Sequence, residues 1–212
     1  LNYFLFYNTV LVETSCIVNS KFWTIRKETE LIWVFYITIL ILLISFIKIN
    51  LLSFKNQKIS QFKSDSKIFD IRKVLEGNMV AEGMVYGISG RLSSTFTAQF
   101  SGDWANNEGS FIENFQFSTG KNQIRKWNLI IDSNGKIIGT ADDIIGKAVG
   151  QQYGSAVMLS YKLKLSEDLG GHVIKVIDWM HLLENDTIFN RSEFRKFGFK
   201  VGELVATFRK EK

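Results

Sequence analysis

Polar and charged side chains interrupt the apolar runs in the C-terminal part of the sequence, and they are the first candidates for chemistry. A charge on the apolar face of a strand costs several kcal/mol unless a partner neutralises it, so each such residue needs an explanation. Two explanations stay open: the residues pair with one another, or they bind the polar part of a ligand. The candidates are Glu113, Arg125, Asp142, Asp178, Asn190 and Arg191.

The sequence lacks the motifs of the common catalytic and metal sites. The run GISGR at 87–91 does not have the spacing of a nucleophile elbow, and GKA at 146–148 does not complete a phosphate loop. His172 and His181 are nine positions apart, so on one strand they face opposite sides and cannot share a metal ion. Cys16 is the sole cysteine, which excludes an intramolecular disulfide and a metal site with several thiolates. We therefore expect no cofactor and no metal.

One uncharged run is long enough to suggest a membrane anchor. Residues 31–47 read LIWVFYITILILLISFI, seventeen residues between Glu30 and Lys48. The run lacks the polar stripe of a buried amphipathic helix, and no small-x-small cleavage site follows it. We expect an uncleaved transmembrane helix over 31–52. The native status of the preceding segment, 1–30, stays open because the first methionine is Met79.

The formal net charge of +5 comes mostly from the N-terminal part of the chain. The first 65 residues hold 7 Lys and Arg against 4 acids, and the remainder holds 19 against 17, which leaves the later part at +2. Binding to nucleic acid needs a clustered basic surface, so we expect no nucleic-acid partner. A content of 46% hydrophobic and 22% charged residues also differs from that of a disordered protein.

The rest of the chain reads as a linker followed by a β-domain. Residues 53–67 are rich in lysine, serine and amides, which predicts a solvated linker before a domain over 68–212. The segment 69–77 predicts a short helical turn with Asp70 as its N-cap. Beyond it, period-two runs without a long amphipathic helix predict about eight to ten strands, in an antiparallel barrel or sandwich. The runs are 80–88, 92–100, 110–117, 123–131, 136–145, 153–165, 172–182, 187–194 and 203–209.

One hairpin can be placed from its turn residues. The loop 118–120 ends on a glycine, which suits the left-handed position of a three-residue connection, and it pairs Phe117 with Lys121. Glu113 then lies opposite Arg125 on a face that also carries several aromatic side chains. The register therefore predicts an ion pair on an apolar wall.

Other turn and aromatic patterns are less specific. The turn DSNG at 132–135 pairs Ile131 with Lys136 or uses a slipped variant of that register. The run KFGFK at 196–200 is typical of a solvated strand face, with contact to a membrane surface as the alternative. Three tryptophans in the β-region are expected to fill the core rather than to stack on a ligand. They are Trp104, Trp127 and Trp179.

Several words, in this order along the sequence, resemble one known family. They are FDIRKVLEGNMVAEGMV from Phe69, WNLIIDSNGKIIGTADD from Trp127, GTADDIIGKAVG from Gly139, DWM from Asp178, NR at 190–191 and KFGFKVGE from Lys196. Together they resemble, over about residues 68–210, the bacterial family catalogued as domain of unknown function three-eight-three-three.

The resemblance implies a lipocalin-like barrel in a small envelope protein, often a lipoprotein, with no established activity. Because no cysteine follows the apolar run, a helical anchor replaces a lipid anchor here. The resemblance also implies export, and we expect a single-pass protein of the bacterial inner membrane with a periplasmic barrel. The lysines after the run favour the opposite orientation, but long domains translocate largely regardless of such charges.

These features lead to three hypotheses for the function. The first is a membrane-anchored envelope protein whose barrel binds a hydrophobic or amphipathic small molecule such as a lipid. The second is a structural or interaction protein with a filled barrel. The third and least favoured is a lipid-acting enzyme with Glu113 or Asp142 as general base. For the first, the expected contacts in the barrel interior are Glu113, Arg125, Trp127, Asp142, Tyr161, Asp178, Asn190 and Arg191.

Overall fold

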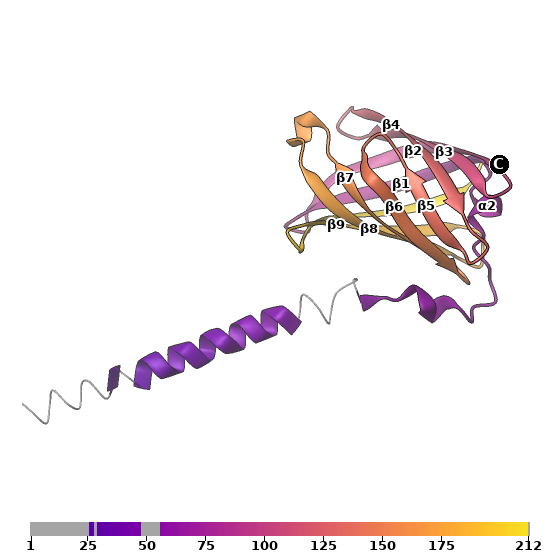
Figure 1. The fold of residues 1–212 in the computed structure, drawn as a ribbon. Coiled ribbons are helices and arrows are strands. Elements are labelled where there is room, and N and C mark those ends of the chain that lie inside the picture. The colour runs from indigo at the N-terminus through magenta and orange to yellow at the C-terminus, as the bar shows by residue number, and fades with distance from the viewer. Residues whose placement is uncertain (1–25, 28, 48–55, 212) are drawn as a thin grey trace, which may run out of the picture. The chain divides into compact units, whose positions relative to one another are not determined.

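The computed structural model describes residues 26, 27, 29–47 and 56–211, in two compact units, Leu1–Asn56 and Gln57–Lys212. The first unit contains the helix Thr29–Ile47 (Figure 1), which is long and apolar enough to cross a membrane by its length and composition. This helix confirms the apolar element expected from the sequence. Residues 48–52 of the expected anchor and residues 1–25 of the N-terminal segment lie outside the described residues.

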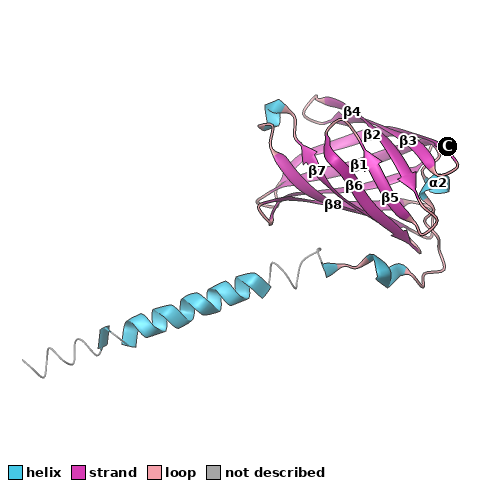
Figure 2. Cartoon of the chain, viewed as in Figure 1, coloured by secondary structure: helices cyan, strands magenta, loops and turns pink. Residues whose placement is uncertain are grey.

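The second unit is a closed barrel of ten antiparallel strands within residues 56–211 (Figures 1 and 2). Each strand pairs with the next along the chain, and β10 pairs with β1 to close the sheet, which confirms the predicted antiparallel barrel. In the β4–β5 hairpin Ile131 lies opposite Ile137, the slipped register of the two expected. The strands are β1 (Gly77–Gly87), β2 (Leu92–Ala105), β3 (Glu108–Phe117), β4 (Asn122–Ile131), β5 (Lys136–Thr140), β6 (Ile144–Tyr153), β7 (Ala156–Lys164), β8 (Val173–Leu182), β9 (Ile188–Lys196) and β10 (Phe199–Lys210).

The run 136–145, predicted as one strand, belongs to two strands. β5 ends at Thr140 and β6 begins at Ile144 after a turn. Gly146 has a φ of +76°, and the pairing of β6 with β7 shifts register after Ile145. Such a bulge interrupts the strict alternation that marks a strand in a sequence, so the pattern misses most of β6.

Large aromatic side chains fill much of the barrel interior because every second residue of each strand points inward. The ring of Phe100 on β2 lies 5.4, 5.5 and 5.1 Å, between centroids, from the rings of Phe111, Phe115 and Phe208. The core and the strand ladders that close the barrel lie within residues 57–212. This unit therefore holds the contacts that it needs to fold without the first unit.

A short helix, α2 (Ile71–Val74), closes one end of the barrel (Figure 1). The side chain of Asp70 accepts a hydrogen bond from the backbone N–H of Arg72, which confirms the predicted N-cap. Phe69, Ile71 and Leu75 are buried in the barrel core. We call this end the closed end. The opposite, open end carries the β1–β2, β3–β4, β5–β6, β7–β8 and β9–β10 turns, with η3 (Glu167–Leu169) between β7 and β8.

The segment 57–67 packs against the barrel, so the solvated linker expected over 53–67 is wrong for these residues. It contains the 3-10 helix η2 (Ile59–Phe62). The ring of Phe62 lies 5.9 Å from that of Trp179 and 5.0 Å from that of His181, on the outside of β8. This aromatic contact, with hydrogen bonds such as that between Gln57 and His181 at 3.1 Å, holds the docked segment to the barrel wall. Composition alone does not reveal such contacts.

Candidate functional site

The hairpin of β3 and β4 places the first two site residues. The backbone N–H of Phe117 donates to the carbonyl of Lys121 at 2.9 Å, and Gly120 has a φ of +83°. Glu113 lies directly opposite Arg125, as the turn residues predict. Both side chains face the barrel interior because they share the inward face of the hairpin with buried aromatic residues.

Arg125 has two acidic partners in the interior. Its Nη1 lies 3.5 Å from Oε2 of Glu113, whereas its Nε donates to Oδ2 of Asp143 at 2.8 Å and its Nη2 lies 2.8 Å from the same oxygen. The indole N–H of Trp127 donates to Oε2 of Glu113 at 3.3 Å. The nearer carboxylate is therefore Asp143, which comes from the turn between β5 and β6.

The expectation that Asp142 faces the interior is wrong. Asp142 is exposed in the β5–β6 turn, whereas the adjacent Asp143 reaches Arg125. The two residues occupy a turn rather than a strand, so strand alternation does not tell which of them points inward. The sequence thus identifies the acidic pair but not the member that binds Arg125.

Asp178 on β8 is the centre of a second group of polar contacts. Its Oδ1 accepts hydrogen bonds from Nδ2 of Asn190 at 2.6 Å and from Oγ of Ser192 at 2.7 Å. The hydroxyl of Tyr161 donates to Oδ2 at 3.4 Å. Sequence reasoning missed Ser192, although its position two residues after Asn190 on β9 places both on the same face.

Arg191 was expected beside Asn190 in the interior, and this expectation is wrong. Asn190 is buried and faces inward, so the next residue on the strand faces outward. The Nε of Arg191 donates to Oε1 of Glu203 at 2.6 Å on the outer wall. The structure brings the other six expected residues together in the interior: Glu113, Arg125, Trp127, Tyr161, Asp178 and Asn190.

Burial shifts the protonation equilibria of this interior group. Burial raises the pKa of Glu113 to about 7, although the positive charge of Arg125 acts in the opposite direction. Burial also raises the pKa of Asp178 above its ordinary range, against the hydrogen bonds that it accepts, and raises the pKa of Tyr161. The interior holds three carboxyl groups, those of Glu113, Asp143 and Asp178, and one guanidinium group, that of Arg125. Acidic groups are therefore in excess at this site.

The neighbouring side chains do not cover these charged groups completely. The side chains of Glu113 and Arg125 each keep 14% of their surface accessible, and that of Asp143 keeps 25%. A water-sized group can therefore reach part of the ion pair. Among the described residues, no group of three His, Cys, Asp or Glu side chains could hold a metal ion. The arrangement can accept hydrogen bonds from a polar group that enters the barrel.

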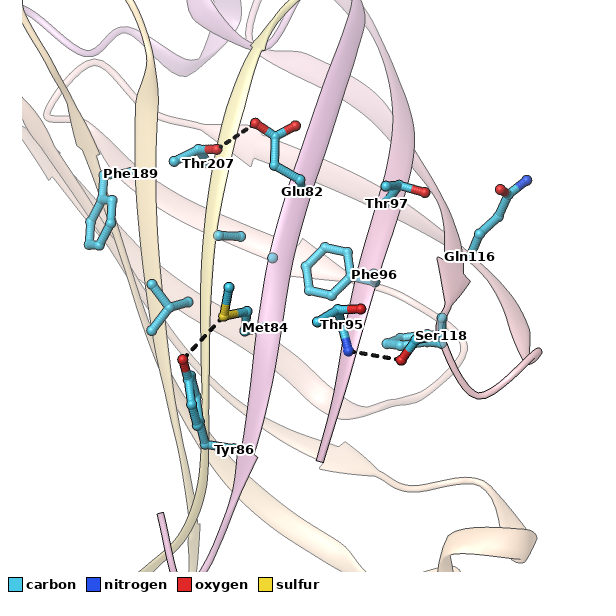
Figure 3. Close-up of a pocket in the computed structure, with 14 residues that line it drawn as sticks. Glu82, Met84, Tyr86, Thr95, Phe96, Thr97, Gln116, Ser118, Phe189 and Thr207 are labelled. Atoms are coloured by element: carbon cyan, nitrogen blue, oxygen red, sulfur yellow. Dashed lines mark hydrogen bonds between the residues drawn. The ribbon is translucent and has the colours of Figure 1, made fainter. Parts of the chain in front are cut away.

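A separate groove of about 710 Å³ lies on the outer wall of the barrel (Figure 3). Side chains from five neighbouring strands, β9, β10, β1, β2 and β3, line it. Met84 and Phe189 contribute exposed apolar surface, and Glu82 accepts a hydrogen bond from Oγ1 of Thr207 at 3.0 Å. The groove residues include none of the eight contacts expected from the sequence. It is therefore a site distinct from the interior group.

Comparison with known proteins gives a family and similar folds. A model of the family described as "Protein of unknown function (DUF3833)" matches residues 48–210, a range that includes the docked segment. No curated protein matches the sequence. Among solved structures, Rv2717c from M. tuberculosis is 12% identical with a TM-score of 0.48, covering 66% of this chain and 94% of that chain. The redesigned β barrel mFAP0, solved with DFHBI bound, is 12% identical with a TM-score of 0.38, covering 65% of this chain and 100% of that chain.

Proposed function

The chain belongs to the family described as "Protein of unknown function (DUF3833)", a description that gives no activity, so we propose a function from the geometry of the interior site. The barrel binds an amphipathic small molecule, with the polar end of the ligand against Glu113 and Arg125. The observation that carries this proposal is that these two inward-facing side chains keep part of their surface accessible. Binding sites for small molecules are typically apolar with a few polar groups that orient the ligand, and desolvated charges that a ligand can still reach are typical of such groups.

The excess of acid indicates the chemistry of the ligand's polar end. Glu113, Asp143 and Asp178 act as acceptors, and Arg125 is the single cation among them. A hydroxyl or ammonium group would complement these acceptors better than a phosphate would. Aromatic rings, including the stacked pair Phe115 and Phe117 with centroids 5.8 Å apart, offer an apolar wall for a hydrocarbon part. A lipid with a hydroxyl-bearing or amine-bearing head group has both features.

The proposed cellular setting follows from the helix Thr29–Ile47 and from the family. The helix is compatible with a membrane anchor, so the barrel would be held close to a reservoir of lipids. We place the protein in a bacterial cell envelope, as a single-pass protein of the inner membrane with a periplasmic barrel. This orientation rests on the family resemblance and is part of the proposal.

The other two hypotheses have less support. An enzyme would need an accessible and unpaired carboxylate as general base, whereas Glu113 is paired with Arg125 and Asp142 lies in a surface turn. A structural role with a filled barrel fits the tightly packed aromatic core, but it leaves the accessible interior charges without a purpose. These alternatives differ from the binding hypothesis in one property, the presence of a bound molecule.

Native mass spectrometry of residues 57–212, purified without detergent, tests the proposal. We expect a second mass series that exceeds the bare chain by the mass of a lipid-sized molecule. Extraction with organic solvent should remove this series and release a molecule that can be identified. Repeated recovery of the bare chain alone, from preparations that retain the native fold, would support the filled barrel instead.

A further inference from the structure

The two ends of the barrel differ in the chemistry of their turns. At the closed end, the turns are rich in polar residues, NN at 106–107, DSNG at 132–135, GS at 154–155 and LENDT at 183–187, and Leu183 among them is 42% exposed. At the open end, three turns carry a large apolar side chain that is exposed to solvent. The exposed fractions are 76% for Ile88, 57% for Leu169 and 89% for Phe197. Among the turns, the most exposed apolar side chains therefore lie at the open end.

The backbone conformation of Phe197 is unfavourable for a residue with a bulky side chain. Phe197 and Gly198 form a two-residue connection between β9 and β10, with φ values of +51° and +84°. The first position of such a turn favours Asn, Asp or Gly, because a bulky side chain at positive φ is strained. The other described non-glycine residues at positive φ are Asn106 and Asp186, which tolerate it. Strain of this kind at an exposed residue points to a role for the side chain.

The β9–β10 and β1–β2 turns lie side by side because β10 pairs with β1, with Gly87 opposite Gly202. Their apolar side chains and the cations between them form what we call the rim patch. The Nζ of Lys196 lies 5.7 Å from the centroid of the Phe197 ring. The rim patch comprises Ile88, Arg91, Leu92, Lys196, Phe197 and Phe199.

We propose that the rim patch docks the open end of the barrel onto an anionic lipid surface. Exposed aromatic and aliphatic tips enter the interfacial region of a bilayer, while Arg91 and Lys196 remain beside the lipid phosphates. Single apolar tips separated by cations suit a fluid surface better than the shaped pocket of a protein partner. The chain also carries its own apolar helix, Thr29–Ile47, which would keep a bilayer at high effective concentration. This docking does not depend on what the barrel interior binds.

Co-sedimentation of residues 57–212 with lipid vesicles tests the proposal. The vesicles contain phosphatidylcholine either alone or mixed with phosphatidylglycerol. We expect binding to the mixed vesicles and binding about tenfold weaker to phosphatidylcholine alone, because each cation near an anionic surface adds to the affinity. Phe197→Asn and Ile88→Ser should each weaken binding to the mixed vesicles by about tenfold.

Two controls separate docking from folding. Ile130→Ser removes an apolar side chain that is 50% exposed on the wall of β4, and it should leave vesicle binding unchanged. Phe197→Asn should raise the melting temperature, because asparagine tolerates the positive φ that strains phenylalanine. The proposal is overturned if the wild-type unit does not sediment with the mixed vesicles. It is also overturned if the two rim variants bind as tightly as the Ile130→Ser control.

Discussion

Arg125 binds Asp143 more closely than it binds Glu113, the residue directly across the hairpin. The Nε and Nη2 atoms of Arg125 each lie 2.8 Å from Oδ2 of Asp143, whereas Nη1 lies 3.5 Å from Oε2 of Glu113. The guanidinium is therefore held by the turn between β5 and β6, and Glu113 is the partner that a ligand can most easily take over. This difference sets the expected effects of substitution.

The two carboxylates should contribute unequally to stability at pH 8. Asp143→Asn leaves a desolvated Arg125 with only the distant Glu113, so it should lower the free energy of unfolding by about 3 kcal/mol. Glu113→Gln keeps the contact of Arg125 with Asp143 and removes a desolvated negative charge, so it should not lower the free energy of unfolding. Asp142→Asn, at the exposed neighbouring position, is the matched control and should stay within about 0.5 kcal/mol. Urea melts measure all three, and equal losses for Asp142→Asn and Asp143→Asn would contradict the assignment.

The pH dependence of stability should report the burial of Glu113. Its pKa is about 7 in the folded chain, above the ordinary 4.5, so the folded state binds this proton more tightly than the unfolded state does. Stability from this group is therefore gained as the pH falls from 7 towards 4.5 and is lost as the pH rises through 7. Relative to Glu113→Gln, the wild type should gain up to about 3 kcal/mol between pH 8 and pH 4.5. A difference between the two proteins that does not vary with pH would show that Glu113 is solvated.

The contact between α2 and the barrel wall can be tested with two glycines. A Cβ on Gly102 would lie 1.7 Å from the carbonyl oxygen of Leu75, so Gly102→Ala must displace the end of α2. We expect a loss of about 3 kcal/mol, because overpacking moves buried groups away from their contacts. Gly87→Ala is the matched control, since a Cβ there meets nothing within 4 Å. Thermal melts should separate the two variants, and similar melting temperatures would mean that α2 does not close the barrel.

The docked segment 57–67 should be released by Phe62→Ala. This change removes the ring that packs on Trp179 and His181, and burial of such a ring contributes about 2 kcal/mol. Trypsin should then cleave after Lys63 roughly ten times faster, since local opening controls access to the backbone. Ser60→Ala, at an exposed position of η2, should leave the cleavage rate unchanged. Equal cleavage rates for the two variants would indicate that this segment is a solvated linker, as its composition suggests, and that Phe62 does not dock it.

Sequence reasoning succeeded where one residue determines local geometry. The three-residue loop ending at Gly120 sets the register of β3 and β4, and that register puts Glu113 opposite Arg125. The alternation of apolar and polar residues along the other strands gives a sheet with one apolar face. Closing the sheet into a barrel buries that face. The inward positions of Asp178 and Asn190 follow from the same rule.

The rest of the site depends on tertiary contacts that no local pattern encodes. Asp142 and Asp143 are adjacent residues of the same type, so no local pattern tells them apart. Only the fold of the β5–β6 turn brings Asp143 to Arg125. The bulge at Gly146 interrupts the alternation of β6, and the contacts of Phe62 with distant residues of β8 dock a segment that is polar in composition. Such features become visible only when distant strands meet in the closed barrel.

The most direct test of the central claim compares ligand retention in two double variants of residues 57–212. Glu113→Gln with Arg125→Met alters the interior pair. Glu82→Gln with Arg209→Met alters an ion pair of the same residue types on the outer wall, where Glu82 lines the groove. Native mass spectra should show the ligand-bound fraction reduced by about tenfold for the interior variant, as expected when a polar contact of a ligand is lost. The outer-wall variant should retain the wild-type fraction. Equal retention by both variants, or loss only in the outer-wall variant, would contradict binding inside the barrel.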